Sequence, residues 1–261
     1  MSAKTKSDSP SLESLIESED IGIEILHPGG LEITRELAEL CRIGKGSLVL
    51  DVASGTGETA CFLVENFGCR VVGIDYSDYM VERAVKKAKE RGLDIELDIE
   101  FRKGDAHNLP FPDNTFDAVI SECTTCLLDK ERAIEEMVRV AKPGGYVGIH
   151  DVCWKENTPE DVRRKLTEIE GERPETLDGW RKLFEEAGLV DVVIIDRSHL
   201  IQEWSKELKR KIGLVGQIRI FLKVIRNWGF EGYRSVREVE RIFQSPYIGY
   251  GIIVGKKPIK L

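Results

Sequence analysis

Residues 48–57 read LVLDVASGTG, an apolar run that meets an acid and is followed at once by small residues and glycine. The apolar run predicts a buried strand, and Gly55 and Gly57 predict a tight turn that leads into a helix. Ligands of α/β proteins bind beyond the carboxyl ends of strands, where such glycines leave backbone N–H groups accessible. An ordinary strand-to-helix turn has the same local pattern, so the rest of the chain must distinguish the two interpretations.

Short apolar runs and longer helix-like stretches alternate along the whole chain. The strand-like runs are 47–53, 69–75, 99–105, 116–122, 144–152, 190–196 and 248–257, and the helix-like stretches are 57–67, 77–92, 129–145 and 176–188. Such alternation predicts an α/β fold with a doubly wound, mostly parallel, seven-stranded sheet that helices cover on both faces. The last strand is expected to be antiparallel, with a helical insertion at 197–247 between the sixth and seventh strands.

Charge and composition exclude some classes of protein. The chain has 261 residues and a formal net charge of −8, so bulk charge gives no reason to expect nucleic-acid binding. No apolar run approaches the roughly 18 residues that a membrane-spanning helix needs. The start of the chain is polar and lacks the apolar centre of a signal peptide, so we expect a mobile tail at 1–26, a single domain at 27–261 and a cytoplasmic protein.

Three further features agree with a ligand site at the glycine turn. Asp75 ends the second strand, where a carboxylate can accept hydrogen bonds from ribose hydroxyls. In GDAHNLPF (104–111), the Asp105 carboxylate can accept a bond from an adenine amino group, and the Ala106 N–H can donate to a ring nitrogen. AKPGGYV (141–147) then enters the fifth strand. This ordered set predicts a nucleoside-containing ligand.

These motifs resemble those of the class I S-adenosylmethionine (SAM)-dependent methyltransferases, from about residue 47 to 152. DVASGTG (51–57) is similar to the ubiquinone/menaquinone C-methyltransferase subgroup, with Ala53 where the family usually has its first glycine. The resemblance implies that SAM is the cofactor, with Asp75 at its ribose, Tyr76 beside its adenine, and Asp105 and Ala106 at the adenine edge. It also implies a set of residues around the methionine moiety: Asp51, Ala53, Ser54, Gly55 and Gly57. A nicotinamide dehydrogenase is disfavoured, because its G-x-G-x-x-G fingerprint would start too late here.

The same resemblance places the methyl acceptor, a small molecule, above the end of the fourth strand at SECTTCLLDK (121–130). This stretch is similar to the arsenite methyltransferase family, which has a cysteine at the position of Cys123. A thiophilic metalloid suits thiolate ligands, and Cys126 is close enough to be a second one. Alternatively, both are small residues that line the pocket. No resident metal site is expected, because one Cys-x-x-Cys pair is a poor zinc site.

Polar side chains near the strand ends supply the other acceptor-side candidates. We expect catalytic roles for Cys123, Glu122 and His150, and substrate contacts from Cys126, His27 and Trp154. Each has an ordinary alternative: Glu122 can cap the following turn, and His27 can belong to a turn before a helix. A SAM-binding protein without catalysis is the least favoured interpretation, and the sequence does not indicate an oligomeric state.

Residues 203–241 contain ten Lys and Arg against five Asp and Glu, with aromatic residues between them. Four apolar residues fall on one face of a helix there: Leu214, Ile218, Phe221 and Ile225. The segment can be a lid over an apolar acceptor, or it can contact an anionic membrane surface, as expected for a quinone or lipid acceptor. A solvated helical cap is the alternative.

Overall fold

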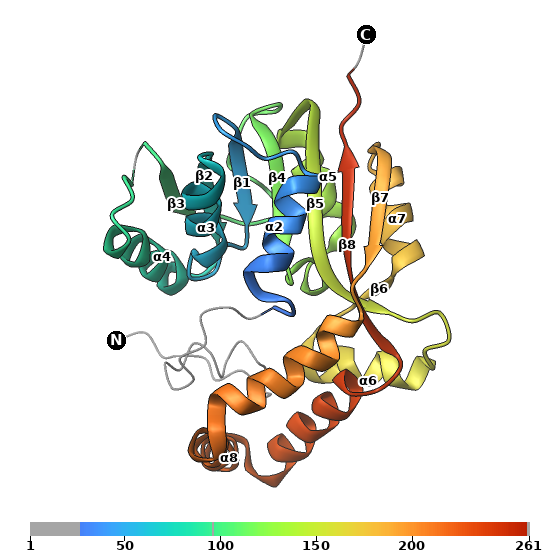
Figure 1. The fold of residues 1–261 in the computed structure, drawn as a ribbon. Coiled ribbons are helices and arrows are strands. Elements are labelled where there is room, and N and C mark those ends of the chain that lie inside the picture. The colour runs from blue at the N-terminus through green and yellow to red at the C-terminus, as the bar shows by residue number, and fades with distance from the viewer. Residues whose placement is uncertain (1–26, 96, 260–261) are drawn as a thin grey trace.

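The computed structural model describes residues 27–95 and 97–259, so the tail expected at 1–26 lies outside the described residues. A seven-strand path runs in the order β3-β2-β1-β4-β5-β8-β7 (Figure 1). The strands are β1 (Leu48–Val52), β2 (Arg70–Asp75), β3 (Ile99–Lys103), β4 (Phe116–Glu122), β5 (Ala141–Trp154), β7 (Val190–Asp196) and β8 (Ile248–Lys256). The first five run parallel, and β8 is antiparallel to both of its neighbours. The predicted α/β architecture with an antiparallel last strand is therefore confirmed.

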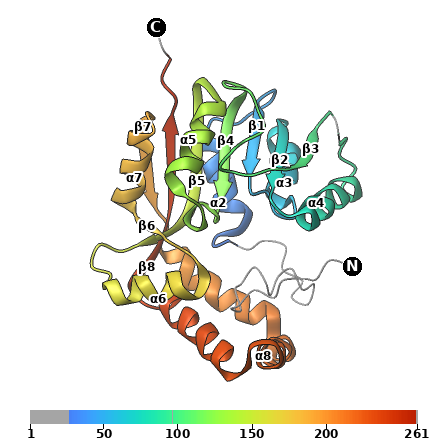
Figure 2. The same ribbon diagram turned by 180° about the vertical axis from the view of Figure 1, so that it is seen from behind.

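Helices cover both faces of this sheet. They are α2 (Gly30–Leu40), α3 (Glu58–Phe67), α4 (Asp78–Glu90), α5 (Lys130–Val140), α6 (Glu160–Glu170), α7 (Leu177–Glu186) and α8 (His199–Phe243), with a 3-10 turn at Thr125–Leu127. Helices α2 and α3 contact each other in front of the sheet in Figure 1, and α5 stands in front in the reverse view of Figure 2. Burial on both faces explains why the strands are almost uninterrupted apolar runs.

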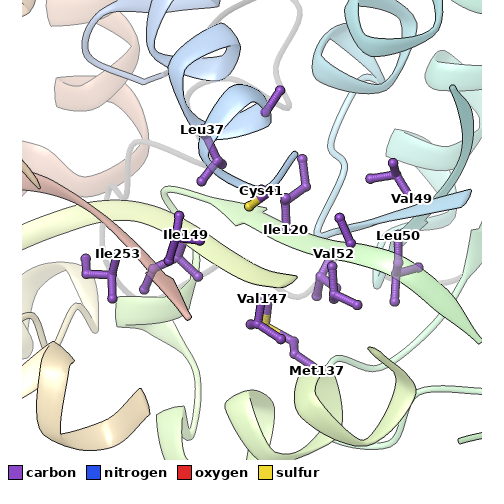
Figure 3. Close-up of a cluster of buried hydrophobic side chains, with 14 of the residues drawn as sticks. Leu37, Cys41, Val49, Leu50, Val52, Ile120, Met137, Val147, Ile149 and Ile253 are labelled. Atoms are coloured by element: carbon purple, nitrogen blue, oxygen red, sulfur yellow. The ribbon is translucent and has the colours of Figure 1, made fainter. Parts of the chain in front are cut away.

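The core fixes α2 against the central strands. Leu37 and Cys41 of α2 point at one face of the sheet, and Met137 of α5 approaches the other (Figure 3). The fit under α2 is close, because a Cβ added to Gly148 of β5 would lie 2.5 Å from the sulfur of Cys41. Each buried aliphatic side chain of this kind contributes roughly 1.5–3 kcal/mol. This packing sets the position of His27, which directly precedes α2.

Helices α6 and α8 lie beyond the carboxyl ends of the parallel strands, where both views show them side by side (Figures 1 and 2). Helix α8 falls inside the insertion expected at 197–247. Gly213 and Gly229 have φ angles of 62° and 67°, so α8 is a chain of helical segments rather than one straight rod. Within the described part of the chain, no helix has the length and apolarity needed to cross a membrane.

Several boundaries differ from the sequence-based expectation. Strand β5 begins at Ala141 rather than 144, because an irregularity with extra residues in β5, between Ala141 and Tyr146, lets Ala141 pair with Phe116 of β4. Strand β3 ends at Lys103, so Asp105 lies in the following turn rather than on the strand. A two-residue strand, β6 (Glu175–Thr176), pairs with β5 and overlaps the start of the helix expected at 176–188, and α6 occupies a stretch to which no element was assigned. Such short or strongly polar elements carry little apolar periodicity.

Candidate active site

The glycine turn has an unusual backbone over residues 53–57. Ala53, Gly55 and Gly57 have φ angles of 62°, 51° and 76°, all in the left-handed region. A Cβ on Gly57 would lie 2.7 Å from Cζ of Phe101, so a side chain is excluded there by packing. A Cβ on Gly55 would instead point into open space. The backbone at Gly55 is therefore a bare surface that a ligand can approach.

Asp75 holds this turn in place. Its Oδ2 accepts a hydrogen bond from the Gly55 N–H at 2.9 Å, and its Oδ1 accepts one from the Ser77 N–H at 2.9 Å. The main-chain oxygen of Asp75 also accepts a bond from the Gly104 N–H at 2.9 Å, which ties the loop after β3 to the end of β2. Each carboxylate oxygen keeps a second lone pair that a ribose hydroxyl can use.

Two polar side-chain atoms beside the turn lack a hydrogen-bond partner within the described part of the chain. Asp51 Oδ2 and Ser54 Oγ are buried and accept no hydrogen bond from the described residues. Burial, and then the charges of Glu122 and Asp75, raise the pKa of Asp51 well above its usual value. A buried polar atom without a partner costs about 1–3 kcal/mol. A ligand with hydrogen-bond donors and a positive charge relieves this cost, so these residues fit the methionine end of SAM.

The residues expected around adenine lie along the same edge. Tyr76 is the residue directly after β2, and it is 77% exposed to solvent. Asp105 Oδ1 accepts a bond from the His107 N–H at 2.9 Å and lies 2.8 Å from His107 Nδ1. The bond from the His107 N–H holds the pKa of Asp105 below its usual value, so this carboxyl is ionised. Ala106 is half-buried next to it.

On the acceptor side, the structure brings together three residues that the sequence singled out separately. Glu122 ends β4 and is paired with His150 of β5. Glu122 Oε1 lies 3.0 Å from His150 Nε2, and Glu122 Oε2 lies 3.2 Å from His27 Nε2. The two imidazole ring centroids are 4.7 Å apart. All three side chains are buried, and we call them the His–Glu–His cluster.

Hydroxyl groups connect this cluster to the glycine turn. Glu122 Oε2 accepts bonds from Thr59 Oγ1 at 2.5 Å and Thr34 Oγ1 at 3.2 Å. Thr59 lies in the first turn of α3, two residues after Gly57. Burial opposes ionisation of Glu122, but His150 and then His27 outweigh it and hold the pKa of Glu122 well below its usual value. An ionised carboxylate therefore stands beside the predicted donor site.

Tyr250 is a site residue that sequence reasoning did not identify. Its Oη lies 2.5 Å from His150 Nδ1 and 2.9 Å from Cys123 Sγ. It stands on β8 opposite Val152 of β5 and is fully buried. The sequence signal was weak, because a tyrosine inside IGYGIIVG is typical of any buried strand. The antiparallel pairing alone brings its hydroxyl to His150.

The remaining acceptor-side candidates are in the core. Burial raises the pKa of both Cys123 and Cys126 well above the usual thiol value, so neither is a ready thiolate. The Cys126 N–H donates to Asp151 Oδ2 at 2.9 Å, outside the His–Glu–His cluster. Trp154 is buried at the end of β5, and the Arg163 guanidinium of α6 lies 5.9 Å from its ring centroid. Substrate contacts from Cys126 and Trp154 stay predictions.

Comparison with known proteins agrees with this geometry. A family profile described as a methyltransferase domain matches residues 50–149. Phosphoethanolamine N-methyltransferase 1 of Arabidopsis thaliana is 32% identical over 209 residues, which are 80% of this chain and 41% of that protein. The chain belongs to the class I SAM-dependent methyltransferases. Sterol 24-C-methyltransferase erg6 of Aspergillus fumigatus is 41% identical to this methyltransferase over 135 residues, 50% of this chain and 35% of the relative.

Solved structures agree on the fold of the methyltransferase. The crystal structure of the [4+2]-cyclase SpnF is 25% identical, covers 98% of this chain and 86% of that one, and superposes with a TM-score of 0.69. Other structures of the same fold hold SAM or S-adenosylhomocysteine. The methyltransferase spans less than half the length of the phosphoethanolamine and sterol relatives. Neither the arsenite nor the ubiquinone/menaquinone subgroup is among the relatives described here.

Proposed function

We propose that this methyltransferase transfers the methyl group of SAM to a hydroxyl or similar protic group of an uncharged, largely apolar small molecule. The observation that carries the proposal is the contact between the His–Glu–His cluster and Thr59. Thr59 opens the helix that follows the glycine turn, so one helix end borders both the donor site and a buried polar cluster. The acceptor's polar group meets the cluster, and its apolar body extends under α6 and α8.

On the donor side, the chain's own residues bind and orient the cofactor. SAM, when bound, supplies a methyl group on a positively charged sulfur. Asp75 offers its free lone pairs to the ribose, and the Asp105 carboxylate takes the adenine amino group. Asp51 and Ser54 gain partners for their buried oxygen atoms. The ionised Glu122 carboxylate suits a cationic ligand.

On the acceptor side, the chain aligns a lone pair with the methyl group and excludes water. A protic group placed beside Thr59 would lie next to Glu122 Oε2, which accepts a bond from Thr59 Oγ1, and the Glu122 carboxylate in turn contacts His27 Nε2 and His150 Nε2. These groups form one connected polar cluster. They can hold the protic group and take up its proton.

Electrostatics favours an uncharged acceptor over a phosphorylated one. Among the described residues, Glu122 contacts ring nitrogens of His27 and His150, and no Lys or Arg pairs with it. A phosphate beside Glu122 and Asp51 would lack a permanent counter-charge. Two like charges about 4 Å apart repel by about 4 kcal/mol near a protein surface. The proposed acceptor therefore shares its apolar, uncharged character with the substrate class of the sterol relative, although the name of that relative specifies methylation of carbon rather than of a hydroxyl.

The metalloid alternative, which rests on Cys123 and Cys126, has less support. A thiolate is the form that binds a metalloid, and the raised pKa values of both thiols favour the protonated form. Cys123 Sγ also has a partner already in Tyr250 Oη at 2.9 Å.

The surface of helix α8 supports the proposal that the enzyme takes an apolar acceptor from a lipid surface. Leu214, Ile218 and Phe221 of the predicted apolar face are exposed. The exposed Arg219 and Arg226 lie on the same helix. The apolar face that the sequence indicated is therefore turned outward, whereas Val224 is buried. An exposed basic amphipathic helix is typical of contact with anionic lipid headgroups.

Transfer from methyl-labelled SAM tests the proposed function. The protein is incubated with sterol, terpenoid alcohol and quinol pools and, separately, with phosphoethanolamine. We expect label in the apolar pool and a large loss of transfer in Glu122→Gln, while calorimetry shows unchanged SAM binding. Label in phosphoethanolamine alone, or no SAM binding by the wild type, would overturn the proposal.

A further inference from the structure

We propose that the His–Glu–His cluster is a binding site for one divalent transition-metal ion, with an open coordination position that faces the acceptor. Two imidazoles and one carboxylate form a recurrent ligand set of catalytic zinc sites, in which the fourth position takes water or substrate. Here the three ligand atoms all lie within 4.8 Å of one another, and two of the three side chains are imidazoles. Each ligand was a separate candidate in the sequence, but their grouping around one point could not be predicted, because they come from three separate segments.

The spacing of the atoms suits a shared ion. Glu122 oxygens lie 3.0 Å from His150 Nε2 and 3.2 Å from His27 Nε2. Two ligands of a tetrahedral ion with bonds of about 2.0–2.1 Å are about 3.3 Å apart. Neither His150 Nε2 nor Glu122 Oε1 makes a hydrogen bond of good geometry with a described residue, although they are this close. Their lone pairs are available to one ion.

Surrounding groups orient two of the three ligands. Metal-binding histidines usually use their second ring nitrogen in a hydrogen bond that fixes the ring. His150 Nδ1 has such a partner in Tyr250 Oη, and Tyr250 Oη lies 2.9 Å from Cys123 Sγ. When Nδ1 carries the ring proton and donates to Tyr250, Nε2 presents its lone pair to the ion. Thr34 and Thr59 hold the other end of the site through Glu122 Oε2.

The charge of the site also favours a cation. Glu122 is a buried carboxylate with Asp51 nearby, and within the described ranges 27–95 and 97–259 neither has a Lys or Arg partner. A buried negative charge without a permanent counter-charge is unfavourable, and a divalent ion supplies one.

The consequence for the reaction rests on the proposed function. With the ion bound, its ligands would no longer accept a proton. A hydroxyl at the open position would therefore lose its proton to water as the acceptor binds, before water is excluded, because a bound ion lowers the pKa of an oxygen ligand. The new C–O bond then forms as the S–CH₃ bond breaks, and S-adenosylhomocysteine leaves.

Metal binding is tested without SAM or acceptor, on the whole chain after treatment with a chelator. Zn²⁺ is titrated by calorimetry, and Co²⁺ is followed by its visible spectrum. We expect one ion per chain, with affinity at least about 100-fold weaker in His27→Gln and Glu122→Gln. His199→Gln alters an exposed histidine at the start of α8 and should bind as the wild type does. Cys126→Ser should also bind normally.

Equal affinity in the wild type and His27→Gln would overturn the site, as would a loss that follows Cys126→Ser. SAM binding, measured separately, establishes that each variant is folded. Because the titration contains no SAM, a protein that binds Zn²⁺ but methylates nothing contradicts the proposed function and leaves the metal site supported.

Discussion

At the scale of single residues, Tyr250 connects His150 of the His–Glu–His cluster to Cys123. Its hydroxyl lies between His150 Nδ1 and Cys123 Sγ, and all of its neighbours there are buried or half-buried. Cys123 itself has a φ angle of 51°, a conformation that a non-glycine residue adopts at a cost of about 1–2 kcal/mol. The Tyr250 hydroxyl thus fixes the orientation of the His150 ring next to Cys123, whose backbone is strained.

Tyr250→Phe removes this hydroxyl and keeps the ring. We expect the methyl-transfer rate to fall about 10- to 100-fold, because His150 loses the bond that sets its orientation. SAM affinity should not change, since Tyr250 lies outside the glycine turn. The readouts are kcat with labelled SAM and calorimetry of SAM binding. Tyr247→Phe, at the start of β8, is the matched control, and equal losses in both variants would contradict the role of Tyr250.

At the scale of elements, the turn between β1 and α3 uses its two glycines for different purposes. A side chain on Gly57 would collide with the packed ring of Phe101 and, at 2.9 Å, with Cβ of Ala84. A side chain on Gly55 would meet no protein atom within 4 Å. Gly57 is therefore needed for folding, and Gly55 for ligand approach.

Alanine at each position separates these roles. Gly57→Ala should lower the free energy of unfolding by about 2–4 kcal/mol, because overpacking adds to the strain of a positive φ. Gly55→Ala should cost only about 1–2 kcal/mol from strain but weaken SAM binding strongly. Urea unfolding and calorimetry measure the two effects. The interpretation is wrong if Gly55→Ala is the less stable variant and binds SAM normally.

The second prediction at the scale of elements concerns helix α8. Replacing Arg219 and Arg226 together by glutamate should reduce binding to vesicles that contain anionic lipid, because both residues are exposed on the amphipathic helix. Arg164→Glu on α6, also exposed, is the control for charge alone. Cosedimentation at low and high salt measures the binding. Wild-type protein that stays in solution at low salt would remove the support for a lipid surface.

At the scale of the whole molecule, buried acids make stability depend on pH. The pKa of Glu172 is raised to about 8, first by burial and then by the charges of Glu170 and Asp151. Burial also raises the pKa of Asp151 to about 6. The folded chain therefore holds more protons than the unfolded chain between the usual carboxyl pKa and these values. The free energy of unfolding falls as pH rises through this window.

Glu172→Gln removes the carboxyl group that has the larger of these two pKa shifts. The variant should match the wild type near pH 4.5 and be more stable by a few kcal/mol near pH 8, since each pKa unit corresponds to about 1.4 kcal/mol. Urea unfolding at both pH values measures the difference. Glu168→Gln, an exposed neighbour on α6, should change stability by less than about 0.5 kcal/mol at either pH. A pH-independent effect of Glu172→Gln would contradict the raised pKa.

The grouping of the predicted donor-side residues could be anticipated from the sequence because its information is local. Asp51, Gly55 and Gly57 follow one strand, and Asp75 ends the next. Parallel pairing of β1 with β2 then places them at one edge of the sheet whatever the rest of the chain does. The 77% exposure of Tyr76 and the turn position of Asp105 could not be read this way, because strand ends are not marked by apolar periodicity.

What the sequence by itself determined is the α/β fold, the strand ends at which the donor site is predicted and the residue types available for an acceptor. Only the tertiary structure decided which of them act together. His27 reaches Glu122 because α2 packs on the sheet through Leu37 and Cys41, and His150 joins them through the pairing of β4 with β5. Tyr250 arrives on an antiparallel strand from near the chain's end. Local patterns encode how a segment folds, whereas contacts between distant segments depend on packing that no single segment contains.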